Sequence, residues 1–213
     1  MKKTDDKERK LSKAEQKRLE NFEITKNGLI EQGYEMKEHT LGLLYANIMA
    51  VVVSLPFFLP VIVIYALVHD GGWWFHMNIK ELILFVAFDV LLIVAHEAVH
   101  GIAWSIFCKN GFKSIEFGIM AEMCTPYCNC SEPLKKNQYI FGSLAPLVVV
   151  GIVPSVIAII TGWYWLFLVG VVMIMGAGGD IIITFRMLKY KTEKQDVIFY
   201  DHPTKCGFVT FER

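Results

Sequence analysis

The chain has 213 residues, of which 54% are hydrophobic and only 20% are charged, and its formal net charge at pH 7 is zero. This apolar content is high for a soluble domain. The neutral balance leaves no basic field, so we expect no nucleic-acid partner.

The first 40 residues are polar and charged. We expect a helix around residues 11–20 and then irregular or strand-like sequence up to residue 40. A cleavable signal peptide would instead show a short basic segment followed by an apolar core, so none is predicted. Residues 1–40 are therefore expected to form a charged arm with a solvated face or a partner-binding surface.

Four long apolar segments follow, and each exceeds the roughly 20 residues needed to cross the hydrocarbon core of a bilayer. They cover about 41–68, 82–108, 139–160 and 163–185. A buried core helix in a soluble protein is the alternative for any single segment, but four in one short chain argue against it. The sequence predicts an all-α polytopic membrane protein, with a four-helix domain over 41–187 and a tail over 188–213.

Lysines and arginines predict the orientation of these spans. The first 40 residues hold ten of them and the tail after residue 185 holds six, whereas the connection between the first two spans holds only Lys80. The positive-inside rule then places both termini and the loop 109–137 in the cytoplasm. An aromatic belt is expected at the opposite interface, formed by Trp73, Trp74, Trp163 and Trp165.

The second span contains the motif His96-Glu97-Ala98-Val99-His100. Positions i and i+4 share a helix face, so both imidazoles can reach one metal ion, and Glu97 is placed to take a proton from an attacking water. Ionisable groups at membrane depth are costly and are seldom kept without a role. We predict a Zn²⁺ site with His96 and His100 as ligands and Glu97 as general base.

A third ligand is predicted at Asp180, in the fourth span. Catalytic zinc uses three protein ligands and one open position. Spans two and four are expected to run in the same direction, and the helical rise places His96, His100 and Asp180 about 21, 27 and 26 Å from the starts of their spans. We expect the Gly-Ala-Gly-Gly run before Asp180 to let span four approach span two closely.

Asp89 is a second acidic group in the second span. It lies on the same helical stripe as His96 but about 10 Å further out along the axis. That separation is too large for it to complete the ligand set. A structural or water-path role is favoured over a position on an ion-conducting route.

The loop 109–137 is expected to contain a small β-hairpin. Residues 113–120 alternate and are rich in strand formers, and residues 125–130 are placed to return as a second strand. Two interpretations remain open at this point. The hairpin either offers an exposed edge to an extended substrate or is an ordinary cytoplasmic hairpin.

Three cysteines and one histidine outside the motif also invite a metal interpretation. Cys124, Cys128 and Cys130 lack the paired CxxC spacing of a structural zinc site, so free thiols are favoured. His202 lies in a polar segment of the tail and is interpreted as a surface turn residue rather than a ligand.

Several of these features together resemble the bacterial "putative zincin peptidase" family of small membrane proteins. The resemblance covers about residues 20–213 and includes the motif in the second span, the Gly-Gly-Asp of the last span, and segments 126–134 and 201–208. That family is similar to the site-2 proteases, which cleave membrane-embedded substrates with a HExxH span and a distant aspartate.

The resemblance implies that His96, His100 and Asp180 bind the metal and that Glu97 is the catalytic base. One departure concerns Asp180, because the site-2 aspartate usually stands in an Asp-Gly pair. Here Gly179 precedes the aspartate and Ile181 follows it.

The sequence thus predicts a zinc-dependent intramembrane endopeptidase that hydrolyses peptide bonds of membrane proteins or peptides near the cytoplasmic face. Two alternatives remain open. One is a proteolytically inactive zinc-binding adaptor in the bilayer, and the other is an ion or metal transporter that uses Asp89, Glu97 and Asp180 along a polar path.

Overall fold

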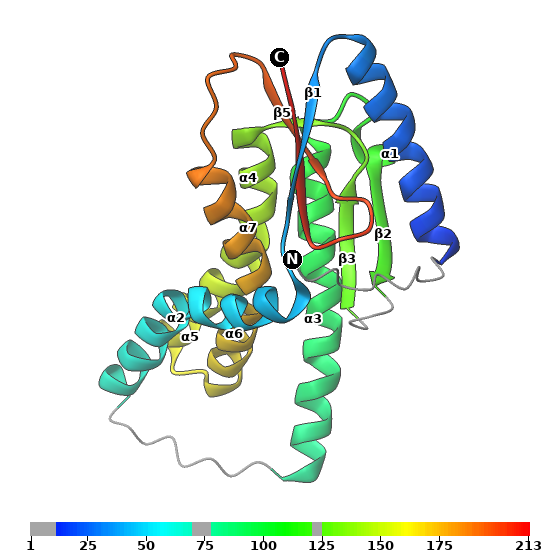
Figure 1. Cartoon of the computed structure of the whole chain (residues 1–213). Helices are drawn as coiled ribbons and strands as arrows, with labels where there is room; N and C mark the ends of the chain where they lie inside the picture. The colour runs from blue at the N-terminus through cyan, green and yellow to red at the C-terminus, as the bar shows by residue number, and fades with distance from the viewer. Residues whose placement is uncertain (1–11, 70–77, 121–124) are drawn as a thin grey trace.

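A computed structural model of the chain describes residues 12–69, 78–120 and 125–213 (Figure 1). The predictions for Trp73, Trp74 and Cys124 lie outside these residues, as do those for the first eleven positions. Helices make up most of the described chain, and two small β-sheets accompany them.

The first helix, α1 (Lys13–Glu31), extends well beyond the expected residues 11–20. Ser12 caps its N-terminus in a capping box with Glu15, so two otherwise unpaired backbone N–H groups are satisfied. Phe22 and Leu29 point from α1 into a buried cluster with Tyr200, Val209 and Phe211. This apolar cluster holds α1 against the sheet formed by the tail.

Each of the four predicted apolar segments is helical. They form α2 (Leu43–Val68), α3 (Ile79–Ser105), a third unit of α4 (Lys136–Pro146), η2 (Leu147–Ile152) and α5 (Val153–Thr161), and a fourth of α6 (Tyr164–Gly176) and α7 (Gly178–Lys189). The η2 turn is π-helical and lies just before Pro154, whose missing N–H cannot continue a regular ladder.

Three of these units are long and apolar enough to cross a membrane, and α6 with α7 makes a fourth if the bent pair is one span. The pair is bent by 43°. This break was not predicted from the sequence. Its position in the Gly-Ala-Gly-Gly run agrees with the low helix propensity of glycine.

Outside these helices, the prediction of an all-α fold is wrong. A four-stranded antiparallel sheet has the order β1-β6-β5-β4, with β1 (Glu35–Thr40), β6 (Gly207–Glu212), β5 (Val197–Asp201) and β4 (Leu134–Lys135). Met36 lies opposite Phe211, and Phe199 lies opposite Thr210. Short alternating segments from the arm and the tail bury aromatic side chains only when they pair, which explains why the isolated segments gave a weak signal.

The predicted hairpin is confirmed as β2 (Ile115–Met120) and β3 (Thr125–Cys130). A short 3-10 turn, η1 (Gly111–Ser114), precedes it. Helix α1 runs along the outer side of β2, where the Asn21 amide donates to Glu116 at 2.9 Å. The outer edge of β2 is therefore covered, whereas β3 faces the helices.

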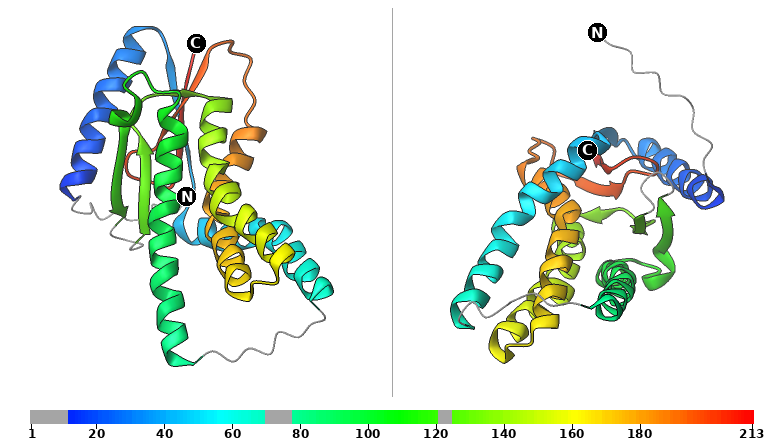
Figure 2. Two further views of the ribbon diagram at one scale, coloured as in Figure 1. Left: turned by 180° about the vertical axis from the view of Figure 1, so that it is seen from behind. Right: turned by 90° about the horizontal axis from the view of Figure 1, so that it is seen from below.

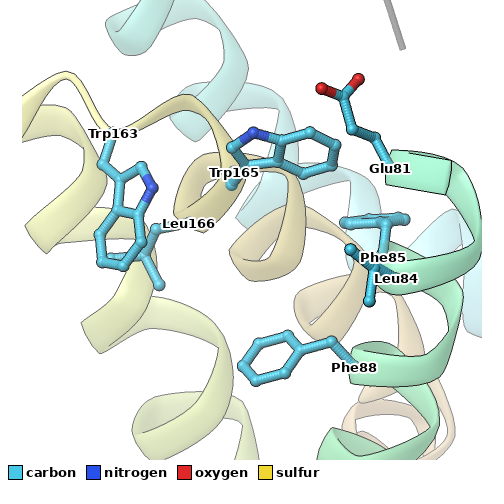
Figure 3. A pocket seen from close by; sticks show the side chains of 7 residues that line it. All are labelled: Glu81, Leu84, Phe85, Phe88, Trp163, Trp165 and Leu166. Carbon is cyan, nitrogen blue, oxygen red and sulfur yellow. The ribbon is translucent and has the colours of Figure 1, made fainter. Parts of the chain in front are cut away.

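Both sheets and α1 gather at one end of α3, and the starts of α3 and α6 lie at the other (Figures 1 and 2). Trp163 and Trp165 lie beside the start of α6, where they line an apolar pocket of about 460 Å³ with Phe85 and Phe88 (Figure 3). These two tryptophans thus lie at the end where the aromatic belt was expected.

Phe211→Ala is expected to lower the free energy of unfolding by about 3–5 kcal/mol, since Phe211 is fully buried in the sheet and its removal leaves a cavity. The measurement is thermal unfolding in detergent. Phe112→Ala is the matched control, because that ring is 53% exposed. Equal losses for the two variants would contradict a stabilising role for the sheet core.

Candidate metal centre

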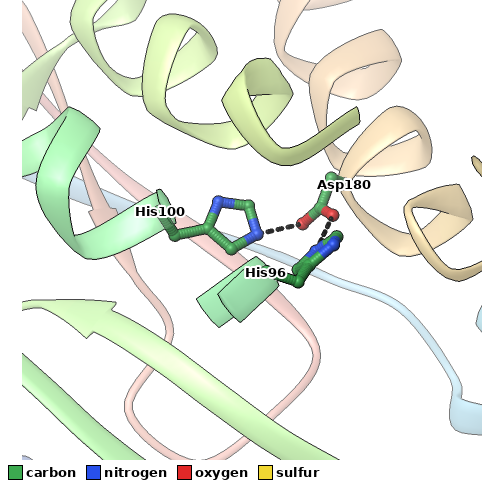
Figure 4. Close-up of side chains that lie close together, drawn as sticks. All are labelled: His96, His100 and Asp180. Atoms are coloured by element: carbon green, nitrogen blue, oxygen red, sulfur yellow. Dashed lines mark hydrogen bonds and ion pairs between the residues drawn. The ribbon is translucent and has the colours of Figure 1, made fainter. Parts of the chain in front are cut away.

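His96 and His100 lie one turn apart near the end of α3, and both are buried. The Nε2 atom of His96 is 3.1 Å from Oδ2 of Asp180, and Nε2 of His100 is 3.3 Å from Oδ1 of the same carboxylate (Figure 4). Two positions separated by more than eighty residues therefore meet at one point. The three side chains that were predicted to share a depth therefore lie together in the structure.

The spacing of these atoms fits a tetrahedral metal ion. One ligand atom from each residue lies within 4.8 Å of the other two, and no other such group of three occurs among the described residues. Ligand atoms about 2.1 Å from a tetrahedral zinc lie about 3.4 Å from one another. Two imidazoles and one carboxylate are also a ligand set that catalytic zinc uses, with one position left open.

A hydrogen bond fixes the orientation of His100. Its Nδ1 atom lies 2.9 Å from the carbonyl oxygen of Gly142 in α4, so the ring donates there and its Nε2 is available to a metal. The Trp104 ring stacks on the imidazole at 5.0 Å, and its indole N–H donates to the Tyr139 carbonyl at 3.0 Å. Helix α4 thus supports the second histidine of the motif.

Asp180 lies in the first turn of α7, where the helix dipole favours a negative charge. The backbone at Gly178 fits against α2, since a Cβ there would lie 2.2 Å from the Ala50 carbonyl oxygen. The glycine run was predicted to bring span four against span two, which is α3. This prediction is wrong, because the run contacts α2 instead. The close approach to span two comes from α4, where a Cβ on Gly142 would lie 2.0 Å from the Trp104 ring.

Glu97 lines the same cavity of about 260 Å³ as His96, His100 and Asp180. Its carboxylate lies beside the backbone of Cys128 in β3. The side wall of the cavity is formed by the hairpin residues Pro126, Tyr127 and Cys128. The cavity therefore holds a carboxylate beside the candidate ligands, and strand β3 forms one of its walls.

Two further residues, Tyr139 and Asp201, line this cavity and were not predicted from the sequence as site residues. The Tyr139 hydroxyl donates to one oxygen of Asp201, and the backbone N–H of Cys130 donates to the other at 3.1 Å. Burial raises the pKa of Asp201. The segment that contains Asp201 was noticed only for its resemblance to a family, because no spacing rule connects it to a motif a hundred residues earlier.

Asp89 does not line the cavity. Its Oδ1 atom is buried and has no hydrogen-bond partner among the described residues. Its predicted structural or water-path role therefore stays a prediction.

Cys128 and Cys130 form no disulfide, and burial raises the pKa of each. That they bind no metal stays a prediction. His202 forms a turn, because its Nδ1 accepts the backbone N–H groups of Thr204 and Lys205. However, His202 is only 7% exposed, so the prediction of a surface residue is wrong. The pairing of β5 with β6 closes the turn against Glu38, which lies 3.5 Å from the ring.

Gly142→Ala is expected to destabilise the protein by about 1–3 kcal/mol, because the added methyl group would collide with the Trp104 ring. Zinc affinity should fall as well, since His100 depends on the Gly142 carbonyl. The control is Gly28→Ala in α1, where a Cβ would meet nothing within 4 Å. Thermal unfolding measures the stability and zinc titration measures the affinity. A Gly142→Ala protein with wild-type stability and zinc affinity would contradict this packing.

Residues 89–194, about half of the chain, match the model of a family described as "Putative zincin peptidase". The matched segment contains the motif of α3, the hairpin and Asp180. Comparison with curated proteins and with solved structures gave no match. The family match supports a zinc-dependent peptidase.

Proposed function

We propose that this protein is a zinc-dependent intramembrane endopeptidase, similar to the site-2 proteases, that cleaves membrane proteins or peptides near the cytoplasmic face. The observation that carries the proposal is the shared cavity of Glu97 with the three candidate ligand atoms of His96, His100 and Asp180. A half-buried carboxylate next to such a ligand set suits hydrolysis. The family match to residues 89–194 supports the same reaction class.

The membrane location is supported by the candidate spans and by the sheet. Strand β1 precedes α2, and it pairs with β6, which follows α7. Paired strands lie on the same side of a membrane, so the chain between them crosses an even number of times. This parity favours counting the bent pair α6–α7 as one span, and the positive-inside rule assigns the paired strands to the cytoplasm.

The chemistry follows from the cavity residues. Zinc held by His96, His100 and Asp180 would polarise the scissile carbonyl and activate a water. Glu97 takes the proton of that water and delivers it to the leaving amine. His100 keeps its Nε2 directed at the site because Nδ1 donates to Gly142.

The hairpin offers a way to bind an extended substrate. The backbone N–H groups of Cys128 and Cys130 point away from β2, toward Glu97 and Asp201 respectively. The outer edge of β3 therefore borders the cavity. A substrate strand that pairs with this edge presents a peptide bond free of helical hydrogen bonds, which favours hydrolysis.

The test is profiling of protein N-termini in membranes that contain the full-length protein. New N-termini in juxtamembrane segments should appear with zinc, disappear with a chelator and return when Zn²⁺ is restored. Zinc binding without any new N-terminus would support the adaptor instead. Zinc-independent ion flux in liposomes would support the transporter.

A further inference from the structure

Helices α2 and α7 cross (Figure 1), and residues of both line a second pocket, which shares no lining residue with the cavity of Glu97. It is a groove of about 500 Å³ that is open to the surface. Its floor is apolar and contains Met49, Val53 and Ile182. Its rim carries three polar groups, which belong to Tyr45, Arg186 and Lys189.

The two cations on this rim are unpaired. Among the residues that the structure describes, the side chains of Arg186 and Lys189 have no hydrogen-bond or ion-pair partner. Arg186 is nevertheless half-buried, which is a costly position for a charge without a partner. An anionic ligand would compensate this charge.

Helix capping does not account for these cations. Basic residues near a helix C-terminus often bind its last carbonyl groups. In α7 this role belongs to Lys136, whose Nζ lies 3.4 Å from the Leu188 carbonyl and 3.2 Å from that of Tyr190. Arg186 and Lys189 are therefore free to bind something else.

We propose that this groove binds one anionic phospholipid of the cytoplasmic leaflet. The phosphate would lie between Arg186 and Lys189 and accept a hydrogen bond from the Tyr45 hydroxyl, while an acyl chain covers Met49 and Val53. Basic pockets between membrane helices bind acidic headgroups in this way, and the cations lie at the end of α7 that the proposed topology places in the cytoplasm. The inference rests on the proposed membrane location and is independent of peptidase activity.

The experiment is native mass spectrometry of the full chain in detergent with equimolar phosphatidylglycerol and phosphatidylethanolamine. The wild type should retain phosphatidylglycerol preferentially. Arg186→Gln/Lys189→Gln should bind it about thirtyfold more weakly, since each cation near an anionic lipid contributes about a fivefold factor. Lys191→Gln/Lys194→Gln removes two exposed charges outside the groove and should change the affinity less than about twofold.

A third variant tests the apolar floor while keeping both cations. Val53→Trp fills the groove, so it should also reduce retention of phosphatidylglycerol. All variants are compared for zinc content and monodisperse elution, so that loss of fold is separated from loss of lipid. Equal lipid retention in the wild type and in Arg186→Gln/Lys189→Gln overturns the proposal. Full displacement of the bound lipid by inorganic phosphate also overturns it. So does a dimer of the wild type that this double variant abolishes.

Discussion

Glu97→Gln is expected to abolish peptide cleavage while the bound zinc stays unchanged. The amide occupies nearly the same volume in the cavity but cannot take a proton from water, and a general base contributes about 10²–10⁴-fold to the rate. The candidate ligand atoms belong to other residues, so the metal content should equal that of the wild type. The measurement is the turnover of a membrane-peptide substrate in proteoliposomes, together with zinc per chain.

The matched control for this prediction is Glu20→Gln, which removes an exposed carboxylate from α1. It should retain full activity. A Glu97→Gln protein that cleaves at the wild-type rate would exclude Glu97 as the base. A Glu97→Gln protein that has lost its zinc would instead place this carboxylate among the ligands.

Asp180→Asn is expected to reduce zinc affinity by more than the 10–100-fold that loss of an outer-shell partner typically causes. The amide is uncharged and leaves only two imidazoles at a site where three ligand atoms lie within 4.8 Å. His100→Ala should have an effect of the same order. Metal analysis of the purified proteins and competition with a chelator measure the change.

Asp89→Asn provides a stringent control for the third ligand. It removes the other aspartate of the candidate spans and lies on the same helix as the histidines, but outside the cavity. We expect its zinc affinity to equal that of the wild type. Equal affinities for Asp180→Asn and the wild type would exclude Asp180 as a ligand.

The meeting of His96 and His100 with Asp180 was predictable because helical geometry is regular, although α7 itself packs against α2. A fixed rise per residue converts sequence position into depth, and two helices that run in the same direction bring equal depths together. His96, His100 and Asp180 illustrate this. The 43° bend before Asp180 was not predictable from the rise alone, but it occurs too close to the aspartate to change its depth much.

The sheet and the far wall of the cavity were not predictable in the same way. Glu35 pairs with Glu212, and no local pattern in either short strand specifies a partner so distant in sequence. The link from Tyr139 to Asp201 depends on that sheet, because β5 carries the aspartate. The contact of Gly178 with α2 was likewise not predictable, because it depends on how all the helices pack.

The strand order β1-β6-β5-β4 also determines when the cavity can be completed during biosynthesis. Strand β6 lies inside the sheet, between β1 and β5, although the ribosome produces it after every other element described here. Asp201 lies in β5, which pairs with β6, so its hydrogen bonds to Tyr139 and Cys130 are stabilised only once β6 has paired with β5. Under the proposed topology, the helices would therefore enter the bilayer with one wall of the cavity missing, and a newly made chain would gain its complete site only after insertion.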